Sequence, residues 1–193
     1  MLYLNDHIDN IDIAQSLQLV SCQRRHKTLR YRHDLDRRLS LAVYLLLQEA
    51  LRTEYGIMEA PEFVFGAHGK PALKAHPEIH FNMSHCSMAA LCVTGDNPVG
   101  CDVETVPDEL DMDVCRYCFS ETEIRHILSS SNPPLAFTKL WTCKEALLKL
   151  TGEGITDNLP TLLSSPEAQR VTFHTIVAPD GRYAYTVCSL GDN

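Results

Sequence analysis

The chain has 193 residues, a formal net charge of −8, 45% hydrophobic and 22% charged residues. This profile excludes a disordered, collagen-like or coiled-coil chain and allows one large domain or two small ones. No stretch reaches the roughly 18 apolar residues of a membrane span, and the first residues lack the basic region of a signal peptide. We therefore expect a cytoplasmic protein with no membrane partner. Its eight cysteines, including the C-x-x-C pair Cys115 and Cys118, are expected to be reduced core residues rather than zinc ligands.

One basic segment interrupts the acidic chain. Residues 24–38 contain seven arginine or lysine side chains against two aspartates. Such a block indicates a local site for an anion or an acidic partner, and the alternative is a solvated helix face. We expect no nucleic-acid partner, because the rest of the chain is strongly acidic and aromatic residues that could stack on bases are sparse near the block.

Apolar periodicity predicts elements throughout the chain after residue 33, whereas residues 1–33 show no clear pattern. A helical spacing covers 34–55, with Gly56 as the C-terminal stop. Ser120 and Glu123 form a capping box, so we interpret Glu123 as structural. The other predicted elements are strands at 63–65, 79–83, 89–94, 99–103, 171–177 and 183–189, a helical segment at 113–118, a helix beginning at 120 and ending near 128, and a helix from Pro133 or Pro134 to about 151.

The order of these elements repeats. A helix followed by strands occurs twice, with no visible sequence identity between the two copies. The class is therefore α+β, with an N-terminal half at 1–105 and a C-terminal half at 106–193, which we expect to form one compact unit.

Two acidic residues stand two apart on a predicted strand. Asp102 and Glu104 point to the same face, because side chains alternate along a strand. Two neighbouring carboxylates repel unless a cation or a proton lies between them, and a hard divalent cation such as Mg²⁺ prefers oxygen ligands. The alternative is a solvated acidic end of a strand.

The long C-terminal helix contributes further candidates. Trp141, Glu145 and Lys149 are spaced by four and follow one helix face, with Lys144 beside them. Glu145 could complete an oxygen site with Asp102 and Glu104, and the lysines could face phosphates that the same metal binds. An ordinary surface with Glu–Lys pairs is the alternative.

The order of several short segments is more specific than any of them alone. Gly69-Lys70-Pro71, Phe81-Asn82-Met83-Ser84-His85, Gly100-Cys101-Asp102-Val103-Glu104 and Trp141-Thr142-Cys143-Lys144-Glu145-Ala146 with Lys149 resemble the 4′-phosphopantetheinyl transferases of the surfactin-synthetase-activating type. The resemblance covers about residues 25–155. It implies transfer of 4′-phosphopantetheine from coenzyme A to a serine of an acyl or peptidyl carrier protein, with release of adenosine 3′,5′-bisphosphate.

The resemblance also implies roles for individual residues. The implied magnesium ligands are Asp102, Glu104 and Glu145, and the implied catalytic residues are Glu145, Lys149 and Asp102. Either Glu145 or a metal-bound water would take the serine proton. The residues implied to bind coenzyme A are Arg25 and Arg38 at the 3′-phosphate, Lys70, Ser84 and His85 at phosphates, and Lys144 and Lys149 at the pyrophosphate.

The resemblance implies a fold in which two similar α+β halves pack as an intramolecular pseudo-dimer, with the coenzyme between them, in a monomer. One rival interpretation is a protein that binds coenzyme A and a carrier protein on the same fold without turnover. Another is a different magnesium-dependent nucleotide enzyme. The acidic residues and Lys149 argue against the first, because a protein without turnover has no need for three metal ligands.

Overall fold

The computed structural model describes residues 1–154 and 158–191. Its helices and antiparallel strands confirm the α+β class. The chain divides into two units, Met1–Pro98 and Val99–Asn193, which are described separately below. Within the part of the chain described, no helix is both long enough and apolar enough to cross a membrane.

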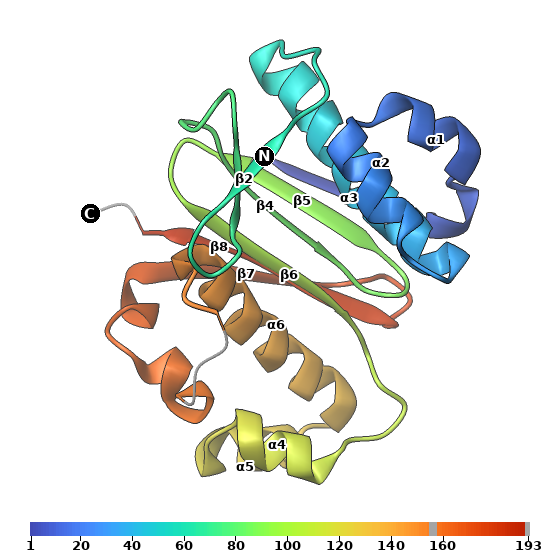
Figure 1. The fold of residues 1–193 in the computed structure, drawn as a ribbon. Helices are drawn as coiled ribbons and strands as arrows, with labels where there is room; N and C mark the ends of the chain where they lie inside the picture. Colours follow the sequence, from blue (N-terminus) through green and yellow to red (C-terminus); the bar gives the residue numbers. More distant parts are fainter. Residues whose placement is uncertain (155–157, 192–193) are drawn as a thin grey trace. The chain divides into compact units, whose positions relative to one another are not determined.

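Unit 1 combines helices with a three-stranded antiparallel sheet of order β1-β5-β4 and a two-stranded hairpin of β2 and β3. In Figure 1 the helices α1 and α2 lie beside the long α3, which packs on the sheet. The elements are β1 (Leu2–Asn5), the 3₁₀ helix η1 (Ile8–Asn10), α1 (Ile13–Leu19), α2 (Cys22–Leu29), α3 (Asp34–Tyr55), β2 (Phe63–Phe65), β3 (Pro71–Leu73), β4 (His80–His85) and β5 (Ala90–Gly95).

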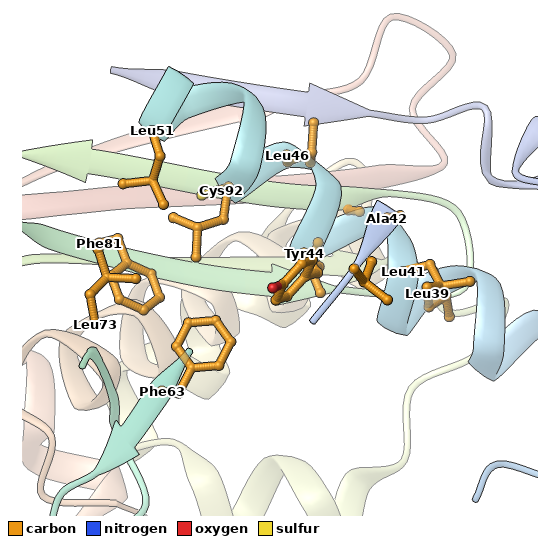
Figure 2. Packing of buried hydrophobic residues seen from close by; sticks show 14 of the residues in the cluster. Leu39, Leu41, Ala42, Tyr44, Leu46, Leu51, Phe63, Leu73, Phe81 and Cys92 are labelled. Atoms are coloured by element: carbon orange, nitrogen blue, oxygen red, sulfur yellow. The ribbon is translucent and has the colours of Figure 1, made fainter. Parts of the chain in front are cut away.

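The core of unit 1 forms where the apolar face of α3 meets the sheet. Figure 2 shows Tyr44 and Leu51 of α3 in the same cluster as Phe63, Phe81 and Cys92. The Tyr44 side chain is fully buried, and its hydroxyl donates a hydrogen bond of 2.6 Å to the Pro61 carbonyl, so the polar atom has a partner inside the core. The helix ends at Gly56, which adopts the left-handed conformation (φ 67°) that glycine accepts without strain.

Unit 2 combines α-helices with a three-stranded antiparallel sheet of order β6-β8-β7. The long helix α6 packs on β6 and β8. The elements are β6 (Val99–Thr105), α4 (Met112–Cys118), α5 (Glu121–Ser129), α6 (Pro133–Thr151), the 3₁₀ helices η2 (Leu159–Ser164) and η3 (Ala168–Arg170), β7 (Val171–Val177) and β8 (Tyr183–Leu190).

Local chemistry sets the ends of the helices in unit 2. Ser120 and Glu123 form the predicted capping box of α5. The Asn132 side chain accepts the Leu135 amide, Pro133 occupies the first turn of α6, and Gly152 ends that helix. Cys115 and Cys118 are both buried in an apolar cluster of this unit.

The two units share one topology. In each, the first strand pairs with the last strand, and the last strand pairs with the one before it. The strand at Val99–Thr105 pairs with β8 along its whole length, so it opens the second unit. The sequence had placed this strand at the end of the first half, with a boundary at 105/106. The repeated order is thus strand, helices, strands, and not a helix followed by strands.

Most of the predicted elements after residue 33 are confirmed within one or two residues. Sequence patterning missed the elements of residues 1–33, the strand Pro71–Leu73 and the 3₁₀ helices η2 and η3. The missed strand β1 lies in the segment without a clear pattern, and the missed strand β3 begins with Pro71, a residue that is unfavourable in strands.

Candidate active site

The acidic strand β6 lies directly against α6 because one of its residues has no side chain. Gly100, Asp102 and Glu104 occupy alternate positions on β6. A Cβ on Gly100 would overlap the Ala146 carbonyl oxygen and would lie 2.8 Å from the Leu150 amide nitrogen. The glycine therefore allows the helix backbone to approach the strand. Gly100 was not among the predicted site residues, although its two-residue spacing from Asp102 was a usable signal.

An ion pair joins the acidic strand to α6. The Lys149 ammonium donates to Oδ1 of Asp102 at 2.5 Å, and the Asp102 side chain is only 2% exposed. Burial alone would lower the pKa of Lys149, but the charge of Asp102 and this hydrogen bond outweigh burial, so the pKa is raised. Lys149 is therefore held in its charged form beside the acidic strand.

Two further carboxylates share this electrostatic environment. Burial, followed by the charge of Asp102, raises the pKa of Glu104 to about 7, against the lowering effect of Lys149 and of the hydrogen bond from the Trp141 indole. Burial also raises the pKa of Glu145; the charge of Lys149 opposes this rise and that of Asp102 adds to it. Three carboxylates thus influence one another around a single ammonium group.

The chemistry of this donor set suits a divalent cation. Asp102, Glu104 and Glu145 offer only oxygen donors and together carry more negative charge than one lysine neutralises. Across residues 1–154 and 158–191 no group of three or more His, Cys, Asp or Glu side chains is already arranged to hold a metal ion.

The structure separates Lys144 from this group. The sequence suggested that Lys144 faces the pyrophosphate together with Lys149. Instead, its side chain is 0% exposed, and its ammonium donates to Glu123 at 2.9 Å and to the Leu159 carbonyl at 2.6 Å. Consecutive helix residues point about 100° apart, so Lys144 and Glu145 project in different directions.

Unit 1 contains a cationic pocket of about 230 Å³. Arg24 and Lys27 of α2 line it, one helical turn apart, together with His85 at the end of β4. Arg24 is buried, its guanidinium donates to the Ser40 carbonyl and hydroxyl oxygens at 3.3 Å, and it lies 5.0 Å from the centre of the Tyr44 ring. Burial, and then the charge of Arg24, lowers the pKa of Lys27. The pocket therefore suits an anion.

The other phosphate contacts predicted in unit 1 do not line this pocket; they are Arg25, Arg38, Lys70 and Ser84. Ser84 is a buried residue of β4, and Lys70 lies between Gly69 and Pro71, which do line the pocket. The exposed Arg25 donates to the Leu17 carbonyl at 2.9 Å, and Arg38 pairs with Asp9 at 3.5 Å.

Arg24 and Lys27 line this pocket, whereas the residue predicted from the sequence was their neighbour Arg25. The usable signal was the i,i+3 spacing of Arg24 and Lys27, which places them on one face of α2, whereas Arg25 projects elsewhere. Each unit carries charged groups that suit a phosphate-bearing ligand. In unit 2, Asp102, Glu104 and Glu145 could bind phosphate through a divalent cation, and in unit 1 the cationic side chains of the pocket could bind it directly.

Comparison with known proteins identifies the family. Residues 98–188 match the family model of the 4′-phosphopantetheinyl transferase superfamily. The chain is 32% identical to the 4′-phosphopantetheinyl transferase psf-1 of Bacillus pumilus over 81% of this chain and 68% of that protein. It is 28% identical to a 4′-phosphopantetheinyl transferase of Bacillus subtilis over 97% and 90% of the two chains. It is 32% identical to the transferase AcpT of Salmonella typhi over 65% and 71%.

The chain therefore belongs to the 4′-phosphopantetheinyl transferase superfamily, and it is an enzyme of this type. The family resemblance stated from the sequence is confirmed.

Proposed function

We propose that this enzyme transfers 4′-phosphopantetheine from coenzyme A to a serine hydroxyl of an apo acyl or peptidyl carrier protein. The by-product is adenosine 3′,5′-bisphosphate, and the reaction depends on magnesium. The observation that carries the proposal is the Asp102–Lys149 ion pair, with Glu104 and Glu145 in the same electrostatic environment.

The acidic residues suit magnesium, and we propose Asp102, Glu104 and Glu145 as its ligands. A magnesium ion bound there would neutralise charge on the coenzyme A pyrophosphate. Either Glu145 or a water bound to the metal would take the proton of the attacking serine.

Lys149 supplies the positive charge of the site. As the serine oxygen forms its bond to phosphorus, the bond from phosphorus to the oxygen of adenosine bisphosphate breaks and negative charge collects on the departing phosphate. The Lys149 ammonium stabilises that charge, and Asp102 holds the ammonium in place through their ion pair.

The cationic pocket of unit 1 supports a role in holding the coenzyme. Arg24, Lys27 and His85 suit phosphate groups, and the half-exposed Phe65 and the Tyr31 ring at the same pocket offer flat surfaces to an adenine base. We propose Lys70, Ser84, Arg25 and Arg38 only as secondary candidates for phosphate contact.

We also propose that the two units pack as an intramolecular pseudo-dimer and that the enzyme is a cytoplasmic monomer. The shared strand order of the two units supports this arrangement, because two copies of one topology within a chain can take the place of two subunits.

Intact-mass spectrometry tests the reaction directly. An apo carrier protein is incubated with the enzyme, coenzyme A and magnesium, with a chelator in a parallel sample and the Asp102→Asn variant as a control of matched shape. We expect the carrier to gain one phosphopantetheine unit in the first sample only. Binding of coenzyme A without any mass gain on several carriers would favour the rival function, a binding module without turnover.

A further inference from the structure

The environment of Lys144 gives this residue a role other than binding phosphate. Its ammonium has three N–H donors, and other groups of the protein surround it. One donor bonds to Glu123 at 2.9 Å and another to the Leu159 carbonyl at 2.6 Å, while the Phe119 ring centre lies 4.9 Å away. With no exposed surface, Lys144 has no route to a substrate phosphate in this arrangement.

The partner carboxylate is itself held in place. The Glu123 Oε2 atom that receives Lys144 also accepts the Ser120 amide at 2.8 Å and the Ser120 hydroxyl at 3.0 Å. The same Glu123 oxygen therefore completes the capping box of α5 and accepts the hydrogen bond that connects α6 to α5. Through the Leu159 carbonyl, Lys144 also connects α6 to the start of η2.

These contacts bear on the residue that follows Lys144. A helix turns 100° per residue, so an anchor at Lys144 sets the direction of Glu145 as well. The opposite constraint comes from β6, where Gly100 allows α6 to approach and Lys149 reaches Asp102. The helix is thus held from two sides, by Lys144 toward α5 and by Lys149 toward β6.

We propose that Lys144 is a positioning residue, whose buried contacts with Glu123 and Leu159 fix the rotation of α6 and so the direction of Glu145. The inference rests on the proposed function, because Glu145 matters through its part in transfer. It replaces the expectation that Lys144 binds the pyrophosphate.

Two variants and a control separate these roles. Lys144→Met removes the ammonium and keeps most of the side-chain volume. Glu123→Gln keeps Lys144 but weakens its anchor. Lys139→Met removes an exposed lysine from the same helix and serves as the control. The measurements are kcat, KM for coenzyme A and the fluorescence of Trp141, the sole tryptophan of the chain.

The proposal predicts a fall in kcat of about tenfold or more in both Lys144→Met and Glu123→Gln, because a small misplacement of a catalytic group has a large effect on rate. KM for coenzyme A should stay within about twofold, since uniform binding is unaffected. The double variant should lose no more than the worse single variant, because both changes break the same contact. Lys144→Arg should recover part of kcat.

Two results would overturn the proposal. A rise in KM for coenzyme A in Lys144→Met, with Glu123→Gln unaffected, would make Lys144 a phosphate ligand. Unchanged kcat and KM in both variants would leave it as a purely structural ion pair. Should Lys144→Met fail to fold, Glu123→Gln with its intact lysine still decides between these outcomes.

The fluorescence separates this inference from the proposed function. The Trp141 ring packs against Phe119, with ring centres 6.4 Å apart, and Phe119 also contacts Lys144. Rotation of α6 should therefore change Trp141 emission in Lys144→Met and Glu123→Gln but not in Lys139→Met. If the unaltered enzyme gave no transfer, the proposed function would fail, while an unchanged emission in both variants would overturn the inference on its own.

Discussion

The ammonium of Lys149 lies 2.5 Å from Oδ1 of Asp102, a residue 47 positions earlier on a different element. The carboxylate is almost fully buried and the lysine is 30% exposed, so the charged pair spans the edge of the unit 2 core. Such a pair is costly to break on one side only, because the remaining charge stays in a poorly solvated position. It links the stability of α6 on β6 to the chemistry that we propose for the site.

The first prediction concerns this pair. We expect Lys149→Met to lower the rate of phosphopantetheine transfer strongly and the free energy of unfolding by about 2 kcal/mol, because Asp102 loses its charged hydrogen-bond donor. Asp102→Asn should also abolish transfer. In the double variant the loss of stability should be smaller than in Lys149→Met alone, because no buried charge remains. Denaturant titration and a single-turnover assay check these values, and an unaltered rate in Lys149→Met would remove this residue from the chemistry.

The second prediction concerns the contact between β6 and α6. We expect Gly100→Ala to lower the free energy of unfolding by about 3 kcal/mol and to reduce kcat, because the added methyl group forces α6 away from β6. Gly66→Ala is the matched control: its Cβ would lie 3.7 Å from the nearest atom, an ordinary contact. The control should change stability by less than about 0.5 kcal/mol. Wild-type stability and rate in Gly100→Ala would refute the close-approach role.

The third prediction concerns pH and Glu104. Its pKa is about 7 in the folded protein and 4.5 as an ordinary glutamate. Between these values the folded state binds more protons than the unfolded state, so the free energy of unfolding should fall as pH rises from 4.5 to 7. The contribution is up to about 3 kcal/mol. Glu104→Gln should flatten this part of the stability curve measured without magnesium, and an identical curve for the variant would contradict the buried, charge-coupled position of Glu104.

The fourth prediction concerns the pocket of unit 1. We expect Lys27→Met to raise KM for coenzyme A about tenfold with kcat unchanged, because a charge-assisted contact to a phosphate is lost. Arg30→Met removes a cation just after the same helix that does not line the pocket, and should leave KM within twofold. Arg25→Met tests the choice made from the sequence. A larger effect for Arg25 than for Lys27 would favour that choice over the pocket.

The elements with strong local signals could be predicted from the sequence. The helix at Asp34–Tyr55 has a clear apolar period and a glycine stop, and α5 has a complete capping box. The short strand β2 was found because Phe63, Val64 and Phe65 are residue types that favour strands. The strands β1 and β3 could not be found in this way, because β1 lies in a segment without a clear pattern and β3 begins with a proline. The strand Val99–Thr105 was recognised from its own residues. Its membership in the second unit was not, because that depends on its pairing with β8, far along the chain.

By itself, the sequence determined the class of elements, the order of the motifs and the family, because these depend on residue types and on spacings along the chain. Only the tertiary structure decided which side chains meet. The adjacent residues Lys144 and Glu145 share one motif, yet packing against Glu123 and Leu159 buries the first, while the second shares the electrostatic environment of Asp102. The tertiary structure likewise places Arg24 in the lining of the pocket and leaves its neighbour Arg25 exposed. The direction of a side chain on a helix has a physical meaning only relative to what the helix packs against, and those contacts come from distant parts of the chain.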